Sequence, residues 1–332
     1  MDKVACCCLK KGGPSPSYSK PSLPCTISFF PGILTSPKRA TGRNTKLRCG
    51  FSFDFDKYKS AKSKAVDEEL ERALPVRQPE RLTESMRYNV FPGGKRAFPV
   101  LAIAACELVG GSAAVATPVA CAVEMVHSMA LIQDDMPCMD DTPLRRGQPA
   151  NHVVFGDYTT LLSGDALLAR AFEHLACGCA QLPPGRALRA VVEFAAGVGG
   201  VAAGQFADKA SEGGPVSLAM LDYITVQKTA RLLQAAAVCG AIVGGGTDGE
   251  IESVRRYARS LGILFQIRDD ELDREEDEAI DKDTYLKLMG VDQAHAYAVE
   301  ALAIAQGELE GFDAERAAPL YHLARFVAYR QN

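Results

Sequence analysis

The sequence predicts an all-α protein, a single helical bundle that encloses a central active-site cavity. Helical periodicity runs through most of the chain after about residue 60, and no apolar–polar alternation long enough for a useful strand occurs. Aspartate clusters end two of the apolar helical runs, so their carboxylates would project into the centre of such a bundle. With 332 residues, 47% of them apolar, the chain is long enough to bury a large core.

The first 50 residues differ in composition from the rest of the chain. They carry nine Lys or Arg residues but a single acid, Asp2, whereas the whole chain has a net charge of −4. A basic segment rich in Ser and Pro is typical of an organelle transit peptide. The alternative is a disordered basic tail for nucleic acid, which the acidic remainder of the chain disfavours. We therefore expect residues 1–50 to be a disordered transit peptide, residues 60–332 to form one helical domain, and no nucleic acid to be bound.

Pro and Gly residues separate the predicted helices. In the first helix Val66, Leu70 and Leu74 share one face, and Pro75 follows as a breaker. Gly-rich breaks such as Gly213–Gly214 separate several of the later helices. The predicted helices span residues 63–74, 81–91, 100–110, 117–135, 159–177, 186–206, 217–243, 247–272, 283–289 and 291–310.

No stretch of the sequence satisfies our criterion for a transmembrane segment. A membrane helix needs about 18 or more uncharged apolar residues. The nearest candidate, residues 232–246, is shorter and rich in Gly. The sequence therefore predicts no transmembrane segment.

One stretch, residues 123–152, combines carboxylates with guanidinium groups at the end of an apolar helical run. Its charged and ionisable residues of interest are His127, Asp134, Asp135, Asp140, Asp141, Arg145 and Arg146. Carboxylate oxygens are the ligands that Mg²⁺ prefers, and arginine forks bind phosphate oxygens in pairs. This stretch therefore predicts a site for magnesium and a diphosphate.

A second acidic cluster lies far downstream in LGILFQIRDDELD, residues 261–273. Asp269 and Asp273 are one helical turn apart and share a face, with Asp270 beside them. Either cluster alone would more simply be a solvated helix end. Together, with the arginine pair between them, the two clusters favour several Mg²⁺ ions held around one diphosphate.

These two stretches resemble the aspartate-rich motifs of the trans-prenyl diphosphate synthases. DDMPCMD followed by LRRGQP resembles the first motif and FQIRDDELD the second, and the resemblance covers about residue 65 to the end. It implies an all-helical isoprenoid synthase fold, Mg²⁺ as cofactor, and isopentenyl and allylic diphosphates as substrates. The implied metal ligands are Asp134, Asp135, Asp140, Asp269, Asp270 and Asp273.

The resemblance also assigns substrate-binding roles. Arg145 matches a residue that holds the allylic diphosphate, as do Lys228 and Thr229 in VQKTARLL, and Gln266 matches a polar residue of that site. The residues that match isopentenyl diphosphate contacts are Arg146, His127 and Lys95 of GGKRAFP.

The residues before Asp134 allow two interpretations. Met129 and Ala130 lie one turn deeper along the helix, where they would form the floor beneath a growing prenyl chain, or they are ordinary packing residues.

Two departures from the family pattern remove cations. The pattern GGKRxRP has a second arginine where this chain has Phe98, and an apolar ring cannot replace a bidentate phosphate donor. The family's GKxxGKD segment is replaced by the acidic DREEDEAIDKDTYLKL, in which Lys282 is the candidate substitute.

These departures most resemble the plastid small subunit, or recruiting protein, of heterodimeric geranylgeranyl diphosphate synthase. That branch carries two CxxxC motifs at the partner interface; here Cys106 and Cys239 remain while Ala102 and Ala235 fill the other positions. The resemblance implies a catalytic large subunit as partner and a place in the plastid stroma or on the thylakoid surface. It also implies a role in precursor supply for chlorophylls and carotenoids.

Three functions compete. A regulatory subunit with weak activity of its own is favoured by Phe98 and the lost lysine segment. A self-sufficient homodimeric synthase, which makes geranylgeranyl diphosphate, is favoured by the intact aspartates. A terpene cyclase also needs an aspartate-rich helix, but its second metal motif usually mixes Asn or Asp with Ser or Thr and Glu, unlike DDELD. Of the three functions, we prefer the hypothesis that the chain is a regulatory subunit.

The transit-peptide prediction is tested by fusing residues 1–55 to a fluorescent reporter. Because the first 50 residues are basic and nearly free of acids, we expect the fusion to enter plastids. A reporter that starts at residue 56 of this chain is the matched control. A cytosolic or nuclear signal from the 1–55 fusion would contradict the prediction.

Overall fold

The computed structural model describes residues 53–279 and 281–331, and the predicted transit segment, residues 1–50, lies outside them. The first four helices are α1 (Phe55–Ala73), α2 (Glu80–Val90), α3 (Ala97–Leu108) and α4 (Ala113–Asp134). The middle of the chain forms α5 (Asn151–Phe155), α6 (Asp157–Gly178), α7 (Pro184–Ser211), α8 (Leu218–Ile224), the π-helix η1 (Thr225–Ala230) and α9 (Arg231–Gly244). The last part forms α10 (Asp248–Leu272), α11 (Arg274–Ala279), α12 (Tyr285–Met289), α13 (Val291–Gly307) and α14 (Ala314–Tyr329).

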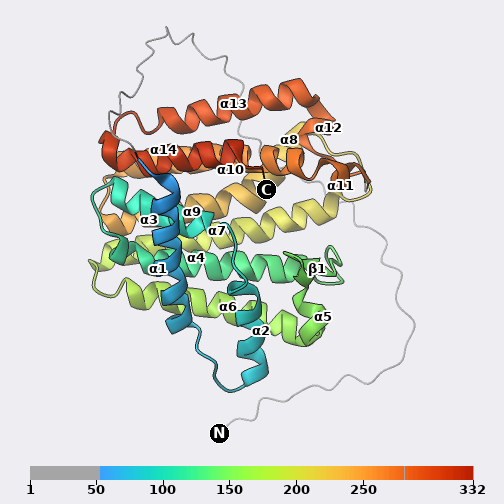
Figure 1. Ribbon diagram of the computed structural model, residues 1–332, viewed down its shortest axis with the longest axis horizontal. Helices are drawn as coiled ribbons and strands as arrows, with labels where there is room; N and C mark the ends of the chain where they lie inside the picture. The colour runs from blue at the N-terminus through green and yellow to red at the C-terminus, as the bar shows by residue number, and fades with distance from the viewer. Residues whose placement is uncertain (1–52, 280, 332) are drawn as a thin grey trace. The chain divides into compact units, whose positions relative to one another are not determined.

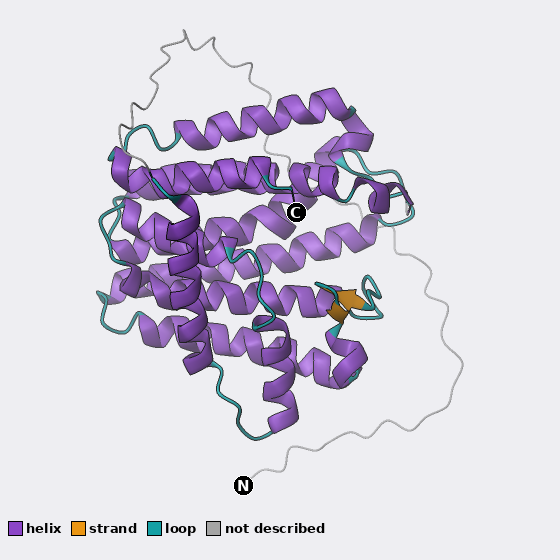
Figure 2. Ribbon diagram, in the orientation of Figure 1, coloured by secondary structure: helices purple, strands orange, loops and turns teal. Residues whose placement is uncertain are grey.

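The all-α prediction is confirmed. In the described part of the chain the only strands are β1 (Leu144–Arg145) and β2 (Gln148–Pro149), an antiparallel pair of two residues each. Figure 2 shows this pair as a small hairpin at one edge of an otherwise helical structure.

Helix α4 lies at the centre of the bundle. It packs against α3, α6 and α9, while α10 packs on the far side of α9 and carries α13 and α14. Figure 1 shows the long helices as stacked rows from α6 to α13, with α1 crossing over them. The core consists of apolar side chains from nearly all of these helices, among them Leu101, Val126, Leu167 and Leu233. The two aspartate-bearing helices, α4 and α10, are thereby held on opposite sides of α9.

The predicted helix over residues 217–243 is interrupted. It divides into α8, the π-helix η1 and α9, and glycines on two neighbouring helices meet η1. A Cβ on Gly204 of α7 would overlap the backbone of Lys228, and one on Gly262 of α10 would overlap Ala230. The wider π turn therefore lies where two helices approach closely, an arrangement that often marks a functional site.

Three helices were not predicted: α5, α11 and α14. Helix α5 has five residues and α11 six, too short for a periodic pattern to emerge. Helix α14 has Pro319 inside it, and α4 likewise begins at Ala113, ahead of Pro118, rather than at residue 117. Proline near the start of a helix is compatible with its geometry, and both helices are held by packing on their neighbours.

Among the described residues, two helices, α4 and α7, are long and apolar enough to span a membrane by length and composition alone, which core helices also satisfy and which does not indicate a membrane span. In α4, 67% of the most apolar window is buried inside the bundle, which accounts for its composition. In α7 only 33% of that window is buried. The apolar surface that α7 leaves uncovered is therefore a property of the fold that calls for an explanation.

The half-present CxxxC positions lie in contacts between helices of this chain. Ala102 of α3 is fully buried and its backbone touches Gly240 of α9, where a Cβ would overlap the Ala102 carbonyl oxygen. Ala235 of α9 is also buried and its Cβ fills the space above Gly197 of α7. Small residues at these positions let the helices approach closely.

Because α3 and α9 lie so close together, we expect a methyl group added at their contact to lower the stability of the fold. Gly240→Ala would push a Cβ into the Ala102 carbonyl group, so we expect a loss of about 2–3 kcal/mol in the free energy of unfolding. Gly199→Ala on α7, where no atom lies within 4 Å of the new Cβ, should instead gain about 0.5–1 kcal/mol. Urea denaturation of the two variants measures both changes, and equal stability of the two would contradict the packing described here.

Candidate active site

A cavity of about 1080 Å³ opens between α4, α7, η1 and α10. One part of its wall is apolar and includes Met129, Ala130, Val201 and Leu232. The remainder is charged. The sequence-predicted site residues that line the cavity are Lys95, His127, Asp134, Arg145, Arg146, Lys228, Thr229 and Asp269.

At the first aspartate cluster, two adjacent carboxylates face different partners. Asp134, the last residue of α4, lines the cavity, accepts a hydrogen bond from Gln205 and lies 3.6 Å from Lys228 Nζ. Burial raises the pKa of Asp134, and the charge of Lys228 opposes that rise. Asp135 is fully buried and accepts hydrogen bonds of 2.9 and 3.1 Å from Arg145 Nε. Asp135 therefore serves as an anchor for Arg145 in this structure.

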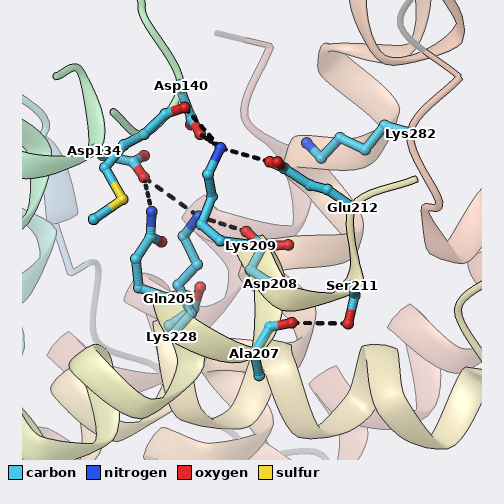
Figure 3. Close-up of polar contacts among 12 residues, drawn as sticks. Asp134, Asp140, Gln205, Ala207, Asp208, Lys209, Ser211, Glu212, Lys228 and Lys282 are labelled. Carbon is cyan, nitrogen blue, oxygen red and sulfur yellow. Dashed lines mark hydrogen bonds and ion pairs between the residues drawn. The ribbon is translucent and has the colours of Figure 1, made fainter. Parts of the chain in front are cut away.

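The loop after α4 returns the third carboxylate of the cluster towards α7. The Asp140 N–H donates to the Asp134 carbonyl oxygen at 2.9 Å, which folds the loop back on the end of α4. The Asp140 side chain lies 3.1 Å from Lys209 Nζ. Figure 3 shows Asp134 and Asp140 on one side of this network and the α7 side chains Gln205, Asp208 and Lys209 on the other.

The two arginines of the first motif project from the β1–β2 hairpin. Arg146 and Gly147 both have positive φ, 55° and 76°, which turns the chain tightly between the strands. The Tyr88 hydroxyl donates to the Pro149 carbonyl oxygen at 2.9 Å and ties the hairpin to α2. Arg146 Nη1 donates to the Gly93 carbonyl oxygen, so the arginine pair and the GGK segment meet at one side of the cavity.

The π-helix η1 presents Lys228 and Thr229 to the cavity. Lys228 Nζ lies 2.7 Å from Asp208. Burial alone would lower the pKa of Lys228, but Asp134 and Asp208 raise it, so the side chain is a firmly held ammonium. The Thr229 hydroxyl donates to Gln266 Oε1 at 3.3 Å, which links η1 to α10.

At the second cluster the three aspartates also differ. Asp269 lines the cavity and forms an ion pair with Arg330. Asp270 is buried and does not line the cavity; it accepts hydrogen bonds of 2.9 Å from Gln266 Nε2 and from the Tyr285 N–H. Burial raises the pKa of Asp270 to about 6, although both donors oppose the rise. Asp273 is exposed at the end of α10.

Phe98 stands beside the predicted isopentenyl diphosphate residues. Its ring is buried and packs on His127, with 4.6 Å between the ring centroids. Burial lowers the pKa of His127, whose Nδ1 atom has no hydrogen-bond partner among the described residues. Burial and the charge of Arg330 together lower the pKa of Lys95. Phe98 thus places an apolar ring within a group of nitrogen donors.

Lys282, the candidate substitute for the missing family lysine, is not part of the cavity wall. Its Nζ lies 2.9 Å from Asp277. Figure 3 shows its ammonium group directed towards Glu212, with no contact drawn between the two.

Several residues around the cavity were missed by the sequence analysis. Gln205, Asp208 and Lys209 lie on one side of α7 at i, i+3 and i+4, a spacing that could have been noticed. Arg330 lies after the last helix, and its buried guanidinium reaches the cavity and rests 4.1 Å from the Phe265 ring centroid. Only the fold brings Arg330 to Asp269, so no local pattern could have indicated it.

The donor set suits Mg²⁺ if a ligand contributes oxygens. Within residues 53–279 and 281–331, no three acidic, His or Cys side chains lie close enough to hold an ion by themselves. Mg²⁺ is usually held by one or two carboxylates, water and substrate phosphates. Asp134 and Asp269 face one cavity from α4 and α10, which fits an ion shared with a phosphate group.

Comparison with known proteins identifies the family. The polyprenyl synthetase family model matches residues 79–295. The chain belongs to the polyprenyl synthetase family. Membership confirms the prenyl diphosphate synthase resemblance, while the small-subunit role stays a prediction.

Plant members of the polyprenyl synthetase family are closely similar to this chain. It is 46% identical to the chloroplastic "heterodimeric geranylgeranyl pyrophosphate synthase large subunit 1" of Arabidopsis thaliana, over 92% of this chain and 88% of that protein. It is 47% identical to the chloroplastic geranylgeranyl pyrophosphate synthase of Capsicum annuum, over 97% and 90%.

Solved structures of isoprenyl diphosphate synthases confirm the fold. An FPP/GFPP synthase from Zymomonas mobilis superposes with a TM-score of 0.78 at 34% identity, over 83% of this chain and 99% of that one. The geranylgeranyl pyrophosphate synthetase of Pyrococcus horikoshii superposes with a TM-score of 0.76 at 26% identity, over 83% and 98%.

Proposed function

We propose that this protein is the regulatory small subunit of a heterodimeric geranylgeranyl or geranyl diphosphate synthase in plastids. It would pair with a catalytic large subunit and enhance or redirect that subunit's condensation of allylic diphosphates with isopentenyl diphosphate. Its plant relatives support the substrate class, and several of them are chloroplastic. The observation that carries the proposal is Phe98, which packs on His127 where the family pattern has a phosphate-binding arginine.

The cavity offers what prenyl transfer requires of a protein. Loss of diphosphate from an allylic substrate leaves a carbocation, so the site must neutralise the leaving group and exclude water. Arg145 and Lys228 line the charged part, where they would bind the leaving diphosphate, and the apolar part would bury the prenyl chain. Mg²⁺ held by Asp134 and Asp269 would supply further positive charge to that diphosphate.

The same cavity lacks two cations of the family pattern. Phe98 occupies one position, and Lys282, paired with Asp277, stands outside the cavity wall. Each lost charge-assisted contact costs roughly 1.5–3 kcal/mol, so the pair would slow turnover by about two to four orders of magnitude if both act in the transition state. We therefore expect this chain to have weak prenyl transfer activity when it has no partner.

The partner would dock on α7 and the adjoining part of α6. Residues at helical spacing along α7 are exposed and apolar; we call Leu188, Val192, Ala195, Gly199, Ala203 and Phe206 the α7 stripe. Val192 is 60% exposed and Phe206 76%, and Tyr158 at the start of α6 is 72% exposed. Apolar surface of this extent usually marks a protein interface. Some relatives of this chain are named as subunits of heterodimeric synthases. The partner we propose is therefore a second chain of the polyprenyl synthetase family, which would present a matching helix face.

A self-sufficient homodimeric geranylgeranyl diphosphate synthase is the second candidate. The observation that favours it is that Asp134 and Asp269 still face the cavity from two helices. In that case the α7 stripe would pair two copies of this chain.

Assays of the full chain, alone and mixed with the Arabidopsis large subunit 1, test the proposal. We expect little product from the chain alone, a stable heteromer on size-exclusion chromatography, and more product from the mixture than from the large subunit alone. A lone chain that makes geranylgeranyl diphosphate at ordinary rates without forming a heteromer would establish the homodimeric synthase instead.

The docking surface itself is tested by a matched pair of variants. Val192→Glu would bury an unpaired carboxylate in the interface, so we expect association with the large subunit to weaken at least about tenfold. Val299→Glu is the control, because Val299 on α13 is 67% exposed but lies outside the α7 stripe. Isothermal titration calorimetry measures both affinities, and equal losses would place the interface elsewhere.

The role of Phe98 predicts a gain of function. Phe98→Arg would add a guanidinium beside His127, and we expect isopentenyl diphosphate to bind about tenfold more tightly. Phe98→Leu also removes the aromatic ring contact but adds no charge, so it should not improve binding. Calorimetric titration decides the matter: equal affinity of both variants would mean that this position does not contact the diphosphate.

A further inference from the structure

Lys209 makes an unusual set of contacts for a lysine near the end of a surface helix. Its Nζ atom donates to the Met139 carbonyl oxygen at 2.7 Å, to Asp140 Oδ1 at 3.1 Å and to Glu212 Oε1 at 2.6 Å. Three oxygen atoms from the loop after α4 and from the end of α7 thus converge on one ammonium group (Figure 3). We call these three oxygens the Lys209 cage.

The Lys209 cage contains the kind of donors that a hard cation prefers. Mg²⁺ and related ions bind carboxylate and carbonyl oxygens, and two carboxylates held this close need a positive charge between them. The Lys209 ammonium supplies that charge from within the chain. Because Asp140 is one of the first-cluster carboxylates, its charge is already neutralised before any metal ion arrives.

Lys209 differs in this respect from the other cations of the first cluster. Lys228 and Arg145 line the cavity beside Asp134 and Asp135, where a bound diphosphate would attract both of them. Lys209 also borders the cavity, but its contacts draw it towards Glu212, at the C-terminal end of α7. A phosphate-binding role therefore does not account for its position.

We propose that Lys209 is a built-in cation that occupies the Asp140 side of the first aspartate cluster and competes there with Mg²⁺. An ion can use the Asp140 carboxylate only after the ammonium has moved away from it. The chain therefore rests with this part of its metal site neutralised. The inference concerns the metal site that the proposed function assigns to this cavity.

A simpler role for Lys209 is that it stabilises the end of α7. A cation in the last turn of a helix interacts favourably with the helix dipole, and the bond to Met139 fastens the neighbouring loop. Removing such a lysine would lower the melting temperature without changing ion affinity. Ion binding is therefore the measurement that separates the two roles.

The experiment titrates Mn²⁺, which takes the same oxygen ligands as Mg²⁺, into the full chain at a fixed concentration of inorganic diphosphate, which supplies the phosphate oxygens that the site needs. Free Mn²⁺ is followed by electron paramagnetic resonance against a protein-free blank that contains the same diphosphate. Lys209→Met keeps the length of the side chain and removes its charge, so we expect the apparent Kd for Mn²⁺ to fall about tenfold. The gain should vanish when Asp140→Asn is added to Lys209→Met. Lys209→Gln, which also lacks the charge but stays polar, should show the same gain and serves if the Met variant does not fold.

Lys62→Met is the matched control. Lys62 and Lys209 have side chains that are 20% and 22% exposed, and each pairs with a carboxylate, but Lys62 pairs with Glu107 on α3, outside the cavity. Its loss should leave Mn²⁺ affinity unchanged. The proposal is overturned if Lys209→Met and Lys209→Gln bind Mn²⁺ no better than the unmodified chain, or if their gain persists without the Asp140 carboxylate. No partner is present and no turnover is measured, so this outcome is independent of whether the chain is a small subunit or a self-sufficient synthase.

Discussion

The structure depends on holding many charges of both signs at the edge of an apolar cavity. A carboxylate that loses water needs a partner, because burial disfavours its charged form. The chain meets this need internally: Asp135 faces Arg145, Asp140 faces Lys209, and Asp269 faces Arg330. The pairs come from five parts of the chain, so the same contacts that neutralise the charges also fix the hairpin, α7 and the C-terminal residues around α4 and α10.

The helices can bring these groups together only because small residues let them approach closely. Gly204 places α7 directly on the backbone of Lys228, and Gly262 does the same for α10 at Ala230. The π-helix between these contacts turns Lys228 and Thr229 to the cavity. The positions of the half-present CxxxC motifs, Ala102 among them, belong to the same close packing. Part of what a family comparison would assign to a partner interface is here internal packing.

Local patterns predicted the fold class and those parts of the site that lie on one helix. His127 and Asp134 share the apolar face of α4, and the motif spacing placed the second cluster on α10, as found. Patterns did not separate Asp134, which faces the cavity, from Asp135, which faces Arg145, because a difference of one residue at a helix end depends on where the next loop turns. They also missed Arg330, whose contact with Asp269 spans 61 residues and exists only in the folded chain.

Helix α7 carries both the exposed α7 stripe and the side chains that hold the first aspartate cluster. It is one continuous helix of 28 residues, about 42 Å long. Phe206 of the stripe is exposed and also lines the cavity, and within one turn of it Asp208 pairs with Lys228 and Lys209 with Asp140. A partner that docked on the α7 stripe would therefore cover the cavity wall at Phe206, within one helical turn of the two side chains that pair with Lys228 and Asp140.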